Sequence, residues 1–243
     1  TTGRAERLSP AITMVPNNPR KMGAEQHFGN FRFERRGGVC ALIDRQGLEL
    51  SASAGAGGCG LAGVDTLGQR ELIAPVGAIE HGMSFRFRSR GLFAAEPGMH
   101  LALGLTGDWR KSDPNQGTFN GKVVGRGAII GNVSGAPHGC SRWPVVQLES
   151  FHRQGNRLVR GSGSIELSDD CWYRLELNAS VRGRIAYRLS NDAGERLSVA
   201  EEDDAGADVE SGLGGWWITH VFSDQHPEVD WRFDIADLRI GWD

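Results

Sequence analysis

An amide and a carboxylate stand two positions apart in the stretch Gln147-Leu148-Glu149. Alternate side chains of a β-strand share a face, so both groups would face one groove, and Arg126 is a candidate to face it from a neighbouring strand. Such groups can hold a polyhydroxylated ligand, and a carboxylate paired with a proton donor can cleave a glycosidic bond. The polar outer face of an ordinary strand explains the same pair without any ligand.

A second candidate is the stretch GGWWITHVFSD (214–224), in which both faces of a strand would be apolar. Trp216, Ile218 and His220 would share one face, and Trp217 and Thr219 the other. We expect one tryptophan to pack in the core and Trp217 to be the better ligand candidate, because flat aromatic faces bind the C–H patches of sugars. Core packing is the alternative for each tryptophan. The candidate binding residues are therefore Trp109, Arg126, Trp143, Gln147, Glu149, Trp217 and His220.

The elements that must position these residues are short strands. Runs of alternating apolar and polar residues are separated by glycine, asparagine and aspartate, and no window has the apolar stripe of a helix. The pattern predicts an all-β, antiparallel sandwich of two sheets. We expect strands at residues 31–36, 39–44, 48–53, 83–89, 99–105, 123–131, 144–150, 156–162, 171–181, 184–190, 195–201, 216–223 and 229–242.

The glycine-rich interval 54–65 is expected to be a flexible loop. Residues 55–60 match the pattern G-x-G-x-x-G, but a dinucleotide site needs a buried strand before the pattern and a helix after it. The preceding LELSASA is too polar for such a strand, and the following LAGVDTLGQ is a poor helix. A nucleotide cofactor is therefore not predicted.

Three stretches of the C-terminal third resemble the concanavalin A-like lectin/glucanase superfamily. They are CWYRLELNASVRGRIAYRLSNDAGERLS, GGWWITHVFSD and WRFDIADLRIGW, and the resemblance covers residues 171–243. It implies a concanavalin A-like jelly-roll sandwich. The fold is shared by lectins, glycanases, lyases and virion or adhesin modules, so it leaves the function open.

The catalytic motifs of this superfamily are incomplete here. Its glucanases carry a Glu-x-Asp-x-x-Glu strand; Glu228-Val229-Asp230 begins that pattern, but Phe233 replaces the final acid. Its alginate lyases carry a Gln-x-His strand, and Glu149 stands where the histidine would be. No catalytic residue is therefore assigned, and a glycoside hydrolase or polysaccharide lyase with a divergent active site is kept as an alternative.

One candidate metal site is found in the sequence, near the last expected strand. The resemblance implies that Asp234 and Asp237, near the last strand, contribute to a structural calcium site, with salt bridging or turn capping as the alternative. The histidines are scattered without ligand spacing, and no other cofactor is predicted. The four cysteines have no C-x-x-C spacing, so two disulfides and four buried thiols both stay open for Cys40, Cys59, Cys140 and Cys171.

Composition excludes several classes of partner. The net charge is -3 and the isoelectric point about 6.2, so the chain lacks the basic surface of a nucleic-acid-binding protein. No apolar run is long enough to insert into a membrane. Only three of the 27 basic residues are lysines, an arginine bias that the base composition of a genome explains better than phosphate binding.

The proline-containing residues 1–26 predict an extended arm, and residues 27–243 a single jelly-roll domain. The arm would either fray or contact a neighbouring subunit of a homo-oligomer. No basic-then-apolar signal segment stands near the start.

Taken together, the residues predict a non-catalytic carbohydrate-binding or surface-recognition module. Its partner would be a glycan or polysaccharide, and its location extracellular or on the surface of a virion or cell. A structural or host-recognition component of a virion or adhesin is the second class kept open.

Overall fold

A computed structural model of the chain describes residues 24–37, 39–45, 49–53, 58–62, 80–93, 100–106, 125–131, 145–152, 155–160, 166–180, 184–203, 215–221 and 230–243. These residues form fourteen strands, and none of them is helical. In these ranges there is accordingly no helix with the length and apolar character needed to cross a membrane. The strands pair antiparallel in two sheets, as the alternating pattern predicts.

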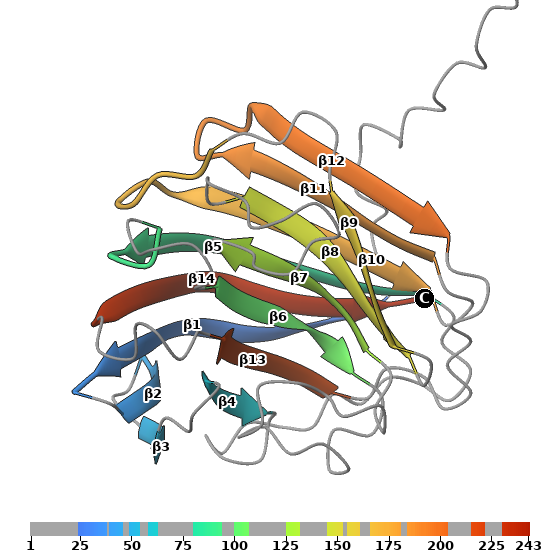
Figure 1. The fold of residues 1–243 in the computed structure, drawn as a ribbon. Coiled ribbons are helices and arrows are strands. Elements are labelled where there is room, and N and C mark those ends of the chain that lie inside the picture. Colours follow the sequence, from blue (N-terminus) through green and yellow to red (C-terminus); the bar gives the residue numbers. More distant parts are fainter. Residues whose placement is uncertain are drawn as a thin grey trace, which may run out of the picture.

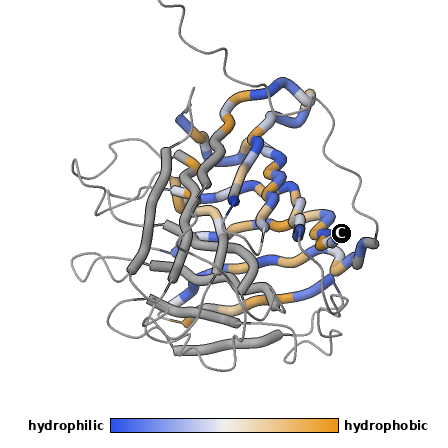
Figure 2. Tube along the Cα trace, turned by 90° about the vertical axis from the view of Figure 1, so that its right-hand side faces the viewer, coloured by the Kyte–Doolittle hydropathy of each residue, from blue (hydrophilic) through white to orange (hydrophobic). Residues whose placement is uncertain are grey.

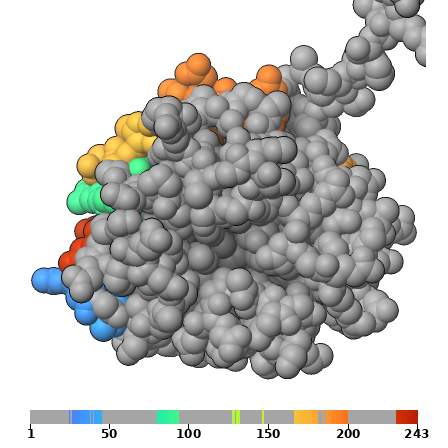
Figure 3. All heavy atoms as spheres, in the orientation of Figure 1, coloured from blue at the N-terminus to red at the C-terminus, as the bar shows by residue number. Residues whose placement is uncertain are grey.

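The larger sheet, here called the back sheet, contains eight strands, among them the first and the last strand in the sequence. β1 (Ala24–Arg36) and β14 (Trp231–Trp242) pair in its interior, with Phe33 opposite Phe233. The strand order is β12 (Arg196–Asp203), β11 (Arg184–Asn191), β10 (Tyr173–Ser180), β5 (Glu80–Arg90), β14, β1, β2 (Val39–Asp44) and β3 (Glu49–Ser53). In Figure 3 the β1–β2 region, β14 and β5 follow one another in that order along one rim of the molecule.

The smaller sheet, here called the front sheet, lies across the back sheet (Figure 1). Its six strands run in the order β4 (Gly58–Ala62), β13 (Gly215–Val221), β6 (His100–Thr106), β7 (Gly125–Gly131), β8 (Val145–His152) and β9 (Gly155–Arg160). Ala128, Ile130 and Val146 of this sheet are buried in one cluster with the aromatic residues of the back sheet. The two sheets therefore enclose a common hydrophobic core.

The core is built from aromatic side chains of adjacent back-sheet strands. The Phe87 ring stacks on those of Phe233 and Tyr173, with centroid separations of 5.4 Å in both pairs. Phe33 meets Trp231 edge-on at 5.1 Å. Figure 2 shows the alternation of hydrophobic and hydrophilic residues along these strands that places one set of side chains inside. Burial of each such ring contributes about 1.5–3 kcal/mol, and each ring pair about 0.5–1.5 kcal/mol more.

Most of the expected strands are confirmed, with two differences at the N-terminal half. β1 begins at Ala24, so residues 24–26, expected in the arm, pair with β14 instead. Residues 1–23 lie outside the described part of the chain, and the arm stays a prediction. The expectation of a loop over residues 54–65 is wrong for Gly58–Ala62, which form β4 on the edge of the front sheet. Ladder hydrogen bonds to β13 use only backbone groups, so a glycine-rich segment can form a strand once a partner strand is supplied.

Candidate functional site

The front sheet has one face in the core and one turned away from it, here called the front face. Ala128, Ile130 and Val146 are buried in the core, so the even-numbered positions of β7 and β8 lie on the core side. Period-two alternation then assigns Gln147 and Glu149 to the front face. Their register confirms that they share it, since Gln147 pairs with Ile129 and Glu149 with Gly127.

Arg126 does not join this pair. It pairs with Ser150 of β8 and occupies an even-numbered position of β7, on the same side as Ala128. The structure thus brings Gln147 and Glu149 together, and places the third member of the predicted group on the opposite side of the sheet.

The predicted strand with two tryptophans is β13, and its register separates its two faces. Leu101 of β6 pairs with Ile130 of the core and also with His220, which places His220 on the core side. Trp217 pairs with Gly104 on one side and Ala62 on the other, at a front-face position. Trp217 and His220 therefore lie on opposite faces, as their spacing of three residues requires.

The residues between Trp217 and Glu149 complete a row across the front face. Gly104 pairs with Trp217 and with Gly127, and Gly127 pairs with Glu149. Three strand spacings of about 4.8 Å separate the two ends of this row, which makes it about 14 Å long at the backbone. Glycine has no side chain, so the row has an aromatic residue at one end, a carboxylate at the other and two residues without side chains between them, of which Gly127 is buried. We call Trp217, Gly104, Gly127 and Glu149 the glycine-floored row.

The sequence alone contains no signal for this row, because Gly104 and Gly127 belong to separate strands that only the sheet register joins. A neighbouring row adds Arg160 of β9, which pairs with Gln147. Trp109 and Trp143, the remaining predicted candidates, lie outside the described residues.

Asp234 and Asp237, the predicted calcium ligands, form hydrogen bonds and ion pairs within the protein. The Asp234 carboxylate is 11% exposed and accepts from two arginines: Arg88 Nη2 lies 2.9 Å from Oδ2, and Arg232 Nε lies 2.7 Å from Oδ1. Asp237 has a positive φ of 56° at a bulge, and its backbone N–H donates to Asn30 Oδ1. This geometry favours the salt-bridge and turn alternatives for the two residues. Elsewhere in the described ranges, no cluster of three His, Cys, Asp or Glu residues could hold a metal ion.

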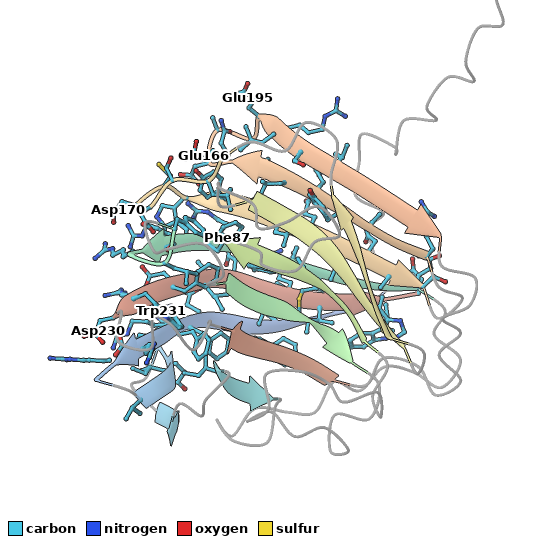
Figure 4. All side chains as sticks on the ribbon, in the orientation of Figure 1. Phe87, Glu166, Asp170, Glu195, Asp230 and Trp231 are labelled. Carbon is cyan, nitrogen blue, oxygen red and sulfur yellow. The ribbon has the colours of Figure 1, made fainter. Side chains whose placement is uncertain are left out.

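Asp230 and Phe233 of the incomplete glucanase motif take part in the fold. Asp230 and Trp231 lie where β14 begins (Figure 4), and Asp230 Oδ1 accepts a hydrogen bond from the Gly37 N–H at 3.0 Å. Phe233, which replaces the last acid of the motif, is fully buried in the core. Asp230 thus closes the β1–β2 turn from the neighbouring strand.

No family model and no curated protein sequence matches this chain. Solved structures do. Lectin II from Ulex europaeus is 8% identical, with a TM-score of 0.53 over 91% of this chain and 99% of that chain. The Lotus tetragonolobus seed lectin is 12% identical, with a TM-score of 0.52 over 90% of this chain and 98% of that chain.

The fold is that of the concanavalin A-like lectins. The predicted fold class is thereby confirmed over nearly the whole chain, although the sequence resemblance was strongest in residues 171–243. At identities of 8–12% the likeness establishes the concanavalin A-like sandwich alone. What the front face binds must be argued from its own residues.

Proposed function

We propose that this protein is a non-catalytic carbohydrate-binding protein whose sugar site lies on the front face. The observation that carries the proposal is the glycine-floored row, which sets Trp217 and Glu149 about 14 Å apart with backbone between them. A sugar ring needs a flat aromatic surface for its C–H face and acceptors for its hydroxyls. The fold of carbohydrate-binding lectins supports the assignment.

In this site Trp217 stacks on the sugar, Glu149 accepts hydrogen bonds from its hydroxyls, and Gln147 can both accept from them and donate to them. Trp109 and Trp143 are proposed to add contacts from segments outside the described residues. Arg126 and His220 are left out of the proposed contacts because their register positions lie on the core side. Among the four described residues of the row, Glu149 is the one carboxylate and Trp217 stands at the other end, which favours binding over hydrolysis.

The test is a glycan array with the wild-type protein, followed by titration of the best sugar against three variants. Trp217→Ala should weaken binding at least about tenfold, equivalent to about 1.4 kcal/mol. Trp217→Phe is the matched control, and it should keep most of the affinity because a flat ring remains. Glu149→Gln should weaken binding while circular dichroism stays unchanged, because an anionic acceptor is lost.

The outcomes separate the alternatives. Equal affinity of a folded Trp217→Ala variant and the wild type would show that the front face is not the site. Oligosaccharide released into the supernatant would contradict the non-catalytic assignment and favour the divergent hydrolase or lyase. The expected result is binding without release that Trp217→Ala and Glu149→Gln weaken and Trp217→Phe largely keeps.

Location and assembly complete the proposal. An extracellular or surface location suits a protein that binds glycans. Assembly into a homo-oligomer through the N-terminal arm, predicted at residues 1–26, is proposed on the sequence alone. Sedimentation of the chain with and without residues 1–23, which precede β1, tests it.

A further inference from the structure

The outer face of the back sheet, on the opposite side of the molecule from the front face, contains an open hollow of about 520 Å³. β1, β2, β5 and β14 contribute to it, and its lining includes four arginines and two aspartates. Arg32, Arg88 and Arg232 alternate along their strands with buried residues that include Phe33, Phe87 and Phe233, which turns these arginines outward, and Arg45 follows the end of β2. We call this the arginine hollow, lined by Arg32, Arg45, Arg88, Arg232, Asp44 and Asp234.

Asp234 is the centre of the cationic side chains. It is directly opposite Arg32 on β1 and Arg88 on β5, and Arg232 precedes it by two positions on its own strand. Its two oxygens accept from Arg88 and Arg232, whose side chains are 23% and 38% exposed, whereas the carboxylate is 11% exposed. The negative charge therefore lies beneath the two guanidinium groups, and their remaining N–H donors are nearer to solvent.

The other two arginines bring further N–H donors to the hollow. Arg32 Nε lies 3.0 Å from Glu34 Oε2, but it is not aligned for a hydrogen bond and is buried without any such partner. Arg45, at the end of β2, is exposed and forms no ion pair with any residue that the structure describes. Because a guanidinium carries five N–H donors, this group of four can bind an acceptor-rich ligand without breaking its internal bonds.

A tryptophan holds part of this group in place. The guanidinium carbons of Arg86 and Arg88 lie 4.9 Å and 4.7 Å from the centroid of the Trp172 ring, which also lines the hollow. Arg86 is held further by an ion pair with Asp192. Cation–π contacts of this kind restrict the rotamers of Arg88, so binding an anion there loses less side-chain entropy.

We propose that the arginine hollow binds an acidic saccharide through its carboxylate or sulfate group. Arginine forks match the geometry of both oxyanions, and none of the described residues that line the hollow is a lysine. Asp44, Asp234 and the amide of Asn30 also line it, and these groups suit sugar hydroxyls but repel a dense polyanion. Its volume of about 520 Å³ falls in the range of small-molecule sites.

The proposal is tested by calorimetric titration of the full chain with sodium sulfate, an oligogalacturonate, a sulfated oligosaccharide, a neutral oligosaccharide and polyglutamate. Arg45→Ala should weaken binding of the acidic probes about fivefold or more. Arg196→Ala is the matched control: Arg196 is exposed on β12, outside the hollow, and the variant loses the same charge. It should bind like the wild type. A preference for oligogalacturonate identifies the recognised group as a carboxylate, and a preference for the other acidic sugar as a sulfate.

A second variant should bind an oxyanion more tightly than the wild type does. Asp234→Asn removes the carboxylate that Arg88 and Arg232 share, so both guanidinium groups become available to an external oxyanion. Sulfate should then bind about fivefold more tightly than to the wild type, and it should raise the melting temperature of the variant more than that of the wild type.

Three results would overturn the proposal: equal losses in Arg45→Ala and Arg196→Ala, equal affinity for neutral and acidic sugars, or tighter binding of polyglutamate than of either acidic sugar. A folded Asp234→Asn variant that gains nothing from sulfate would do the same. If that variant does not fold, the Arg45 comparison decides. Sulfate titration is independent of the glycan array, so failure of the front-face site and failure of this one are distinguishable.

Discussion

Removal of one buried hydroxyl, Tyr187→Phe, should loosen the contact between the two sheets. Tyr187 projects from β11 of the back sheet, and its Oη lies 3.0 Å from the carbonyl oxygen of Val146 on β8 of the front sheet. The same oxygen lies 2.9 Å from Ser198 Oγ. A carbonyl oxygen can only accept, so the Tyr187 proton goes to Val146, and Ser198 must be the donor in the other bond.

Tyr187→Phe removes both hydrogen bonds, and Tyr187 and Ser198 are each only 3% exposed. Loss of a partner for buried polar groups costs about 1–3 kcal/mol, so we expect a loss of about 2 kcal/mol in the free energy of unfolding. For a chain of this length that corresponds to a fall of about 4–8 °C in melting temperature. Ser198→Ala should cost less, about 0.5–1.5 kcal/mol, because the bond from Tyr187 to Val146 survives.

Urea unfolding followed by tryptophan fluorescence measures both values, with an unchanged m-value as the condition for comparing midpoints. Tyr173→Phe is the matched control, because its hydroxyl accepts a bond from the Ser168 N–H at 2.9 Å, in the segment just before its own strand. Val146 precedes Gln147, so Tyr187→Phe should also weaken sugar binding, which the control should not. A change below about 0.5 kcal/mol, or one no larger than that of Tyr173→Phe, would refute the bridging role.

The remaining predictions concern a buried histidine and a turn glycine. Burial lowers the pKa of His81 below its ordinary value of 6.5. The unfolded chain then binds a proton as the pH falls through about 6.5 while the folded chain does not, so stability should drop below that pH by up to about 1.4 kcal/mol per pH unit. In His81→Leu, the urea midpoint should fall less steeply than in the wild type as the pH is lowered through that range. Equal slopes for the two proteins would contradict the role of His81 in acid destabilisation. Gly91 has φ of +86°, and a Cβ there would lie 3.3 Å from the Asp230 carbonyl oxygen. Gly91→Ala should therefore lower stability by about 1–2 kcal/mol. Gly194→Ala, with φ of +83° and nothing within 4 Å, has the backbone strain without the contact and should cost less in the same assay.

Much of the fold follows from local pattern. The alternation from Cys171 to Leu177 predicts a half-buried strand, and β10 buries Tyr173, Leu175 and Leu177 while Arg174 is exposed. The same pattern turns Trp172 outward, where the structure shows it under two arginines. Alternation succeeds because the side-chain period of a strand is a local property of the backbone.

β4 is a strand that the local sequence pattern does not predict. Gly58, Gly60 and Ala62 have low strand propensity, and the segment is a strand because β13 pairs with it. The sequence distance between the two strands exceeds any local window, so composition favoured a loop.

The sequence by itself determined that this chain is an antiparallel sandwich, which segments other than β4 form its strands and which residues alternate within them. Only the tertiary structure decided which strands are neighbours and in what register. That register places Trp217 in line with Glu149 across two glycines, and Asp234 between Arg32 and Arg88. Period two assigns a face within one strand, but the residues that meet across a sheet depend on pairing between distant segments, which burial of the common core selects.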